Sequence, residues 1–268
     1  MKLGMIGTGR MAQAIVGGLL QSGSIPPEQI YGTDPHEESC RAFLKLDPQG
    51  RLGWAVDLAS LLPGCTILLI AVKPQQIGEV LPVLKGADAG ACVVSIAAGV
   101  SMAQLEAELG VDRPIIRVMP NTPMMVGRGV VAWCGNAALT IEHAAAVDTL
   151  FGAVASVHRV EEKEMDAVTA LSGSGPAFFY RLIQYMEEAA VAEGLAPERA
   201  RVMAAVTAMG AAEMLLRTGL EPGELVAQVR SKGGTTEAGL AVLEQGLCRN
   251  LLTQTITAAA SRSRELGS

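Results

Sequence analysis

The fold is decided by the segment Leu3-Gly4-Met5-Ile6-Gly7-Thr8-Gly9-Arg10-Met11-Ala12. Residues 3–6 are a short aliphatic run typical of a buried strand, and residues 10–21 have helical spacing. The loop between them has the pattern GxGxxA. Its first glycine permits a tight turn, its second lets the backbone approach a pyrophosphate, and its small third residue lets helix pack on strand. The segment predicts a dinucleotide-binding strand–turn–helix, although an ordinary strand–helix turn can share the pattern.

Short aliphatic runs of this kind recur over the first 160 residues, each too short for a helix and rich in β-branched residues. After residues 3–6 they lie at 30–33, 67–72, 92–96, 115–119 and 130–133. Segments with helical spacing lie between several of them, at 37–46, 75–84 and 101–109. The alternation predicts an α/β fold with a Rossmann-type, doubly wound parallel sheet, buried on both faces because polar residues do not interrupt the strands.

The strand pattern stops near residue 160, and Gly and Pro then separate helical segments. Pro176 and Pro197 stand where helices would begin, and Gly194 and Gly219 where the preceding ones would end. These helices carry apolar residues on nearly every face, so another subunit is expected to cover them. We expect a Rossmann domain over residues 1–160 and an all-α domain over residues 161–268.

Composition excludes several classes of protein. Of the 268 residues half are apolar, and the net charge of −6 provides no basic field for nucleic acid or an anionic membrane. Five scattered cysteines indicate reduced thiols, and three histidines without ligand spacing indicate no metal site. The apolar runs are far shorter than the roughly 20 residues of a membrane span, and glycines interrupt the N-terminal segment before a signal-peptide core. We therefore predict a cytoplasmic protein.

Further cofactor contacts are expected where predicted strands end, because open α/β sheets bind ligands outside the carboxyl ends of their strands. Asp34 would accept hydrogen bonds from an adenosine ribose 2′-hydroxyl and repel a 2′-phosphate, which favours NAD(H) over NADP(H). A solvated turn beside Pro35, or phosphate binding by Arg41, remains an alternative. The cofactor-binding residues predicted from these loops are Gly7, Thr8, Gly9, Arg10, Met11, Ala12, Asp34, Ala71, Val72, Lys73, Pro74, Ala97, Ala98 and Gly99. Taken alone, the segments 71–74 and 97–99 also fit plain strand-to-helix loops.

Three later segments carry further motifs: RVMPNTP at 117–123, LSGSGP at 171–176 and SKGGTTEAGL at 231–240. With residues 7–12 and 71–74 they have the order and spacing found in pyrroline-5-carboxylate reductases, which the chain resembles over essentially its whole length. The resemblance implies a helical domain that interleaves with its partner into a homodimer, and in many members a ring of dimers. It also implies hydride transfer from NADH or NADPH to the C=N carbon of L-Δ1-pyrroline-5-carboxylate, giving L-proline in the last step of proline biosynthesis.

The segment 231–236 lies between two helical stretches. The residues from Gly233 to Thr236 would then present free N–H groups at a helix N-terminus, an anion site suited to the substrate carboxylate. A glycine-rich turn capped by threonine is the alternative. The resemblance places substrate contacts here and makes Thr236 the catalytic candidate, its hydroxyl bonding the ring nitrogen. The predicted substrate-binding residues are Glu162, Gln228, Ser231, Gly233, Gly234, Thr235 and Thr236.

Other positions are less distinctive. Asn121 and Thr122 are expected to fix the nicotinamide amide or ribose, or else to form the turn between two prolines. Glu162 is placed by the resemblance near the substrate amine, with a solvated charge as the alternative. The chain departs from most relatives in having Lys232 for proline and Gln228 for the more frequent asparagine. Asp34 replaces the small hydroxyl residue seen in some relatives.

Two other functions compete with this interpretation. A β-hydroxyacid dehydrogenase would carry a catalytic lysine within a helix of the second domain, but Lys232, in a glycine loop, is the only lysine after the charged junction near residue 160. A non-catalytic dinucleotide-binding dimer that senses redox state would keep residues 7–12 and would have no need of residues 231–236.

Overall fold

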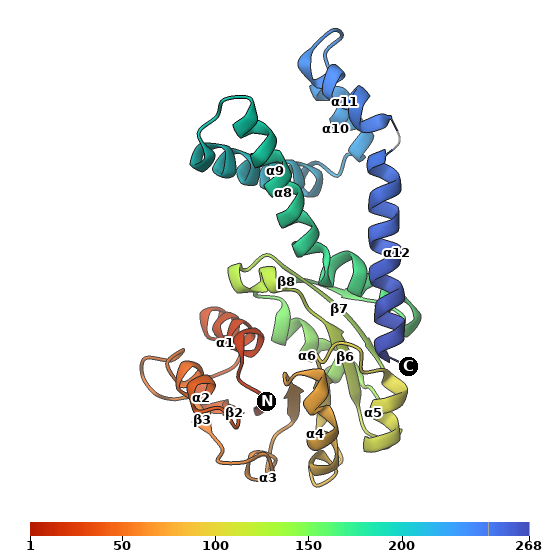
Figure 1. The fold of residues 1–268 in the computed structure, drawn as a ribbon. Helices are drawn as coiled ribbons and strands as arrows, with labels where there is room; N and C mark the ends of the chain where they lie inside the picture. The colour runs from red at the N-terminus through yellow and green to blue at the C-terminus, as the bar shows by residue number, and fades with distance from the viewer. Residues whose placement is uncertain (246, 268) are drawn as a thin grey trace. The chain divides into compact units, whose positions relative to one another are not determined.

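The computed structural model describes residues 1–245 and 247–267, which form two compact units (Figure 1). The sheet unit comprises residues 1–174 and the segment that starts at Ala259. The helical unit comprises Gly175–Ala258.

The sheet unit is built on eight strands in the order β3-β2-β1-β4-β5-β6-β7-β8. Their bounds are β1 Leu3–Ile6, β2 Ile30–Thr33, β3 Gly53–Trp54, β4 Ile67–Ile70, β5 Cys92–Ser95, β6 Ile115–Met119, β7 Gly129–Gly135 and β8 Ala155–Arg159. Neighbouring strands pair in parallel apart from β6 and β7. The Rossmann-type sheet is thus confirmed, with one change of direction.

The sheet departs from the expected parallel pairing at β7, which runs antiparallel to β6 with Val118 opposite Trp133. The connection is the short 3₁₀ segment η3, Thr122–Val126, and a parallel pair needs a crossover of a dozen or more residues. The sequence pattern also missed β3, which has two residues, and β8, which alternates half-buried and exposed side chains.

Helices cover both faces of the sheet, as predicted. One apolar core includes side chains of α1 (Arg10–Ser22), α2 (Glu37–Leu44) and α6 (Ile141–Phe151). The other includes side chains of α3 (Leu58–Leu61), α4 (Ile77–Leu84) and α5 (Met102–Leu109). The strands contribute alternate residues to the two cores: Met5 and Leu69 face one, and Ile6 and Ile70 face the other.

After β8 the chain forms the short η4 turn (Glu162–Glu164), α7 (Met165–Val168) and the π-helical turn η5 (Thr169–Gly173). Met165 is buried in the second core, so these turns belong to the sheet unit. The boundary expected at residue 160 rests on a change in the hydrophobic period of the sequence. The contacts that define the two units are a different criterion, so this boundary stays a prediction.

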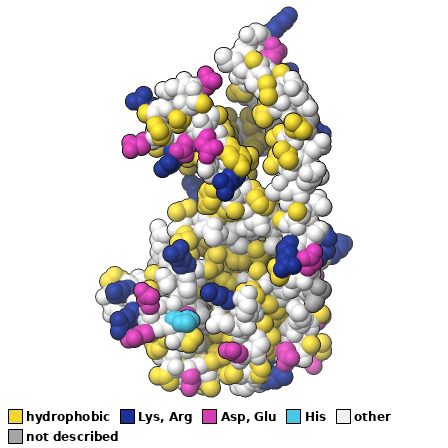
Figure 2. Space-filling view, viewed as in Figure 1, with side chains coloured by type: hydrophobic (Ala, Val, Ile, Leu, Met, Phe, Trp, Pro, Cys, Tyr) yellow, Lys and Arg dark blue, Asp and Glu magenta, His cyan; other side chains and the backbone are white. Residues whose placement is uncertain are grey.

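The helical unit contains α8 (Gly175–Ala192), α9 (Pro197–Thr218), α10 (Pro222–Val229), α11 (Thr235–Glu244) and the first part of α12 (Leu247–Gly267). Pro197 and Pro222 occupy the first turns of α9 and α10, where a missing N–H is harmless. Large apolar side chains remain exposed on these helices, Leu216 by 87% and Met209 by 63%. Figure 2 shows hydrophobic side chains gathered on one face of the molecule. Exposed apolar surface on this scale marks an interaction surface.

Candidate functional site

The glycine loop after β1 has the backbone that its sequence pattern requires. Gly7 has φ +87°, and a Cβ there would lie 2.9 Å from the carbonyl carbon and oxygen of Ala71. Gly9 is the N-cap of α1 without a side-chain cap, and apart from its immediate chain neighbours no described atom lies within 4 Å of a Cβ built on it. Ala12 is fully buried between helix and sheet. The N-terminus of α1 is therefore open to an anion at Gly9, whereas Gly7 and Ala12 are packed against the rest of the sheet unit.

Asp34 lies at the end of β2 and contacts this loop directly. Its Oδ2 accepts hydrogen bonds from the N–H of Thr8 at 2.8 Å and from the Thr8 hydroxyl at 3.3 Å, and its Oδ1 accepts from the N–H of His36 at 2.9 Å. Asp34, Gly7 and Val72 line a pocket of about 320 Å³. Arg41, the alternative phosphate ligand, is paired with Glu37 on the surface of α2.

The structure brings the predicted cofactor loops to one edge of the sheet, because β2, β1, β4 and β5 are adjacent and parallel. The Ala71 N–H donates to the carbonyl of Ile6 at 2.7 Å, so the loop after β4 begins beside the glycine loop. Lys73 and Pro74 are exposed. After β5, Ala97 is buried, Ala98 is exposed and Gly99 has φ +77°.

Asn121 follows β6, the next strand of the same edge, but its side chain is used within the protein. Its Oδ1 accepts from the N–H of Val130 at 2.8 Å, and its Nδ2 donates to the carbonyl of Ser172 at 3.1 Å. The residue is 7% exposed, whereas Thr122 is exposed. The geometry assigns Asn121 to holding the turns after β6 and α7, and its contact with a nicotinamide stays a prediction.

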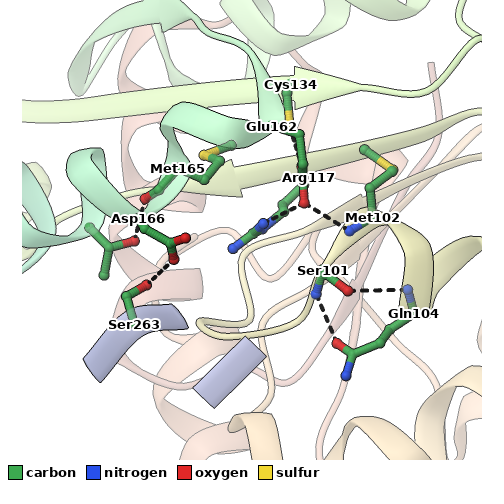
Figure 3. A network of polar contacts seen from close by, with 10 residues as sticks. Ser101, Met102, Gln104, Arg117, Cys134, Glu162, Met165, Asp166 and Ser263 are labelled. Atoms are coloured by element: carbon green, nitrogen blue, oxygen red, sulfur yellow. Dashed lines mark hydrogen bonds and ion pairs between the residues drawn. The ribbon is translucent and has the colours of Figure 1, made fainter. Parts of the chain in front are cut away.

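Glu162 is the centre of a polar cluster in the sheet unit (Figure 3). Its Oε1 accepts from the Met102 N–H at 3.0 Å and from Arg117 at 2.5 Å. Its Oε2 accepts from the thiol of Cys134 at 2.8 Å. The carboxylate thus joins the start of α5 to the neighbouring strands β6 and β7.

The charges of this cluster shift two pKa values. Burial by itself would raise the pKa of Glu162, but its three donors together hold that pKa below the ordinary value. Burial, followed by the hydrogen bond to Glu162, raises the pKa of Cys134 to about 12. At neutral pH the carboxyl is therefore ionised and the thiol remains a donor.

The partners of Glu162 were not predicted from the sequence. A signal was present, because Arg117 is the one charged residue in the strand Ile115–Met119, and a charged residue inside a buried strand needs a partner. Nothing local to Cys134 pointed to Glu162, which is 28 residues away.

The predicted substrate loop lies between α10 and α11 in the helical unit. Gly233 has φ +72°, and its N–H donates to Oε2 of Glu237 at 2.8 Å. The Gly234 N–H donates to the carbonyl of Ser231 at 3.0 Å, and a Cβ on Gly234 would lie 2.4 Å from the Ser231 hydroxyl oxygen. The expectation of four free N–H groups is thus wrong for the two glycines, whose donors are used by the turn itself.

The two threonines keep the expected geometry. The first intrahelical bond of α11 joins the Ala238 N–H to the Gly234 carbonyl, so the N–H groups of Thr235 and Thr236 precede the helical ladder. Within the described residues neither N–H has a protein acceptor. Thr236 is half-buried, and Lys232 and Gln228 are exposed. The predicted substrate residues therefore divide between the two units, with Glu162 in the sheet unit and the others in the helical unit.

Across residues 1–245 and 247–267, no group of three or more His, Cys, Asp and Glu side chains is placed to hold a metal ion. No helix in the same ranges has both the length and the apolarity that crossing a membrane requires.

Two family models match the chain: pyrroline-5-carboxylate reductase dimerisation over residues 162–266, and NADP oxidoreductase coenzyme F420-dependent over residues 2–99. Pyrroline-5-carboxylate reductases of Methanosarcina acetivorans and Arabidopsis thaliana are each 40% identical to it, over 99% of this chain and 98% and 95% of theirs.

Solved structures give the same result. That of a pyrroline-5-carboxylate reductase from Coxiella burnetii has a TM-score of 0.93 at 33% identity, covering 100% of this chain and 98% of that one. That of the Plasmodium falciparum pyrroline carboxylate reductase, with NADP bound, has a TM-score of 0.87 at 30% identity and the same coverage. The chain therefore belongs to the pyrroline-5-carboxylate reductase family, whose members are oxidoreductases with a nucleotide-binding domain and a C-terminal dimerisation domain.

Proposed function

We propose that the protein reduces L-Δ1-pyrroline-5-carboxylate to L-proline with NADH or NADPH, the last step of proline biosynthesis. The observation that carries the proposal is a pair of open helix N-termini, those of α1 and α11, in a chain similar over its full length to pyrroline-5-carboxylate reductases. The first fits the pyrophosphate of a nucleotide and the second fits the carboxylate of the substrate.

On the cofactor side, the bound nicotinamide nucleotide supplies the hydride. The open space at Gly9 fits a pyrophosphate, since backbone N–H groups can approach it without a Cβ between them. Asp34 already accepts three hydrogen bonds, and an ionised carboxylate has about four acceptor sites. One site remains for a ribose 2′-hydroxyl, whereas a 2′-phosphate would meet a like charge. This supports a preference for NAD(H).

On the substrate side, the N–H groups of Thr235 and Thr236 and the positive end of α11 would bind the carboxylate. The Thr236 hydroxyl would accept from the iminium N–H and donate to the amine that replaces it. Glu162 stays ionised and has one acceptor site beyond its three donors, which supports its proposed part in binding the substrate. A protonated iminium is already electrophilic, so orientation is the main task of these residues.

We also propose that the helical unit forms a homodimer, with a ring of dimers as a further step. The apolar side chains exposed on α8 and α9 support this, because a single copy leaves them in water. Sedimentation at micromolar concentration tests it, and a monomer would contradict it. The cytoplasmic location stays a prediction.

The purified protein should oxidise NADH or NADPH, followed at 340 nm, only when pyrroline-5-carboxylate is supplied. Absence of turnover with both nucleotides would refute the proposal. Thr236→Ala should lower kcat/KM by about 10–100-fold, because a hydrogen bond to a charged group contributes about 1.5–3 kcal/mol. The nucleotide Kd should be unchanged, and Thr235→Ala, which keeps its N–H, is the matched control. An equal loss of kcat/KM and nucleotide binding would show that Thr236 acts through the fold.

A further inference from the structure

The loop between β5 and α5, residues 96–101, is contacted on two sides by segments that follow residue 160 in the sequence. On one side the Glu162 carboxylate accepts from the N–H of Met102, the first residue of α5. On the other side the C-terminal end of α12 packs on Gly99. The loop's own backbone is unusual at that glycine, where φ is +77°. The conformation of this strand-end loop therefore depends on contacts distant in sequence.

The contact between α12 and Gly99 is close and partly made by backbone. A Cβ on Gly99 would lie 3.3 Å from both the Cβ and the carbonyl oxygen of Leu266. Leu266 also lines a pocket of about 500 Å³ together with Ala98, Gly99 and Pro74. This pocket therefore joins the C-terminal end of α12 to the two strand-end loops, 71–74 and 97–99, that are predicted to contact the nucleotide.

A hydrogen bond fixes this end of α12 to the sheet unit. The Ser263 hydroxyl donates to Oδ1 of Asp166 at 2.6 Å, and Ser263 is 7% exposed although its neighbours on the helix are exposed (Figure 3). Asp166 lies in α7 beside Met165, which is anchored in the core. Ser263 and Leu266 are three residues apart and lie on the same face of the helix, so fixing one restrains the other.

We propose that the C-terminal end of α12, residues 259–267, is a positioning element for nucleotide binding, with Ser263 as its tether. The hydrogen bond to Asp166 holds Leu266 against Gly99 and keeps residues 97–99 in the conformation that accepts the nucleotide. This inference rests on the proposed role of residues 97–99 in cofactor binding. Because coupling between two sites is reciprocal, bound nucleotide must in turn stabilise the docked end of α12.

The first test is Ser263→Ala, with Ser261→Ala as the matched control. Ser261 lies on the same helix, and its hydroxyl only accepts a long hydrogen bond from Arg264 at 3.5 Å. Titration with NADH and NADPH, followed by nucleotide fluorescence, should give a Kd raised about 5-fold for Ser263→Ala. That is the low end of typical coupling, since the Glu162 contact remains. The KM for pyrroline-5-carboxylate should be unchanged, as should kcat at saturating nucleotide.

A truncation that ends the chain at Arg264 removes Leu266 and should raise the nucleotide Kd at least as much as Ser263→Ala does. A truncation that ends at Gly267 keeps Leu266 and should leave the nucleotide Kd unchanged. Hydrogen exchange gives a readout apart from activity. In the wild type, nucleotide without substrate should slow exchange of the amides of residues 259–267, and Ser263→Ala should weaken this protection.

The outcomes separate this inference from the function on which it rests. Ala98→Leu adds bulk on the exposed side of the loop without touching the tether. If it raises the Kd while Ser263→Ala and the truncation at Arg264 bind nucleotide as the wild type does, the inference about α12 is overturned and the role of the loop stands. If all three variants bind normally, both are overturned. A loss of thermal stability with an unchanged Kd would also overturn the inference.

Discussion

Replacing Gly9 by alanine should weaken nucleotide binding while leaving the fold intact. Gly9 has φ −67° and ψ −174°, which alanine adopts without strain, and the added methyl would meet no protein atom within 4 Å. Two effects on the free energy of unfolding oppose each other. Alanine restricts the unfolded chain, which stabilises by about 0.4–1 kcal/mol, but it is a poorer N-cap than glycine by a similar amount. The net change should stay within about 1 kcal/mol.

The effect on binding should be larger, because the methyl would stand between the phosphates and the N–H groups of the first turn of α1. Loss of one hydrogen bond to a charged group is expected to weaken binding by about 1.5–3 kcal/mol. The Kd for NADH or NADPH should therefore rise about 10–100-fold. Gly9→Ala should thus raise the nucleotide Kd without a comparable change in the free energy of unfolding.

Gly7→Ala is the matched comparison, two residues away in the same loop. With φ +87° and a Cβ 2.9 Å from the Ala71 carbonyl, alanine at position 7 is strained, and backbone strain of this kind costs about 1–3 kcal/mol before the contact is counted. Urea unfolding and nucleotide fluorescence titration measure the two quantities for both variants. A wild-type Kd for Gly9→Ala would refute the placement of the phosphates. A stability loss in Gly9→Ala equal to that of Gly7→Ala would refute the account of the loop.

Three further predictions concern carboxylates. Asp34→Ser should move the ratio of kcat/KM for NADH over NADPH toward NADPH, and an unchanged ratio would remove Asp34 from cofactor choice. Glu162→Gln should lower the free energy of unfolding by about 2 kcal/mol, between the values for exposed and buried pairs, because Arg117 is 11% and Glu162 40% exposed; unchanged urea unfolding would contradict this. Asp47→Asn tests acid stability, because the hydrogen bond from Arg51 lowers the pKa of Asp47 to about 2. Its stabilisation is complete above the ordinary carboxyl pKa and is lost as the pH falls toward 2. The Tm difference between wild type and Asp47→Asn should shrink from pH 5 to pH 2, and a constant difference would contradict the assignment.

The sequence predicted those parts of the molecule whose requirements are local. The turn from β1 to α1 is an example, because the positive φ of Gly7 and the N-cap position of Gly9 are requirements of the turn itself. The helix ends at Pro197 and Gly219 are further examples, since a missing N–H and a positive φ act on their own turn. The burial of both sheet faces followed from unbroken aliphatic runs in the same way.

Features that depend on partners distant in sequence could not be predicted. The direction of β7 is a different case: its hydrophobic pattern does not record it, because side chains alternate equally in parallel and antiparallel strands, but the short connection after β6 does indicate it. The side chain of Asn121 bonds Ser172, 51 residues away, and neither stretch of sequence indicates this pairing. The hydrogen bond from Ser263 to Asp166 spans 97 residues, and neither neighbourhood indicates the other.

The return of α12 to the sheet unit has a consequence for folding during synthesis. Residues 1–174 leave the ribosome first, then the helical unit, and only afterwards the segment from Ala259 that belongs with the first part. At about 5–20 residues per second, several seconds separate the two parts of the sheet unit. During that interval Asp166 and Gly99 lack their contacts with α12, while the helical unit is already free to associate. Subunit pairing can therefore begin on a nascent chain before its nucleotide-binding half is complete.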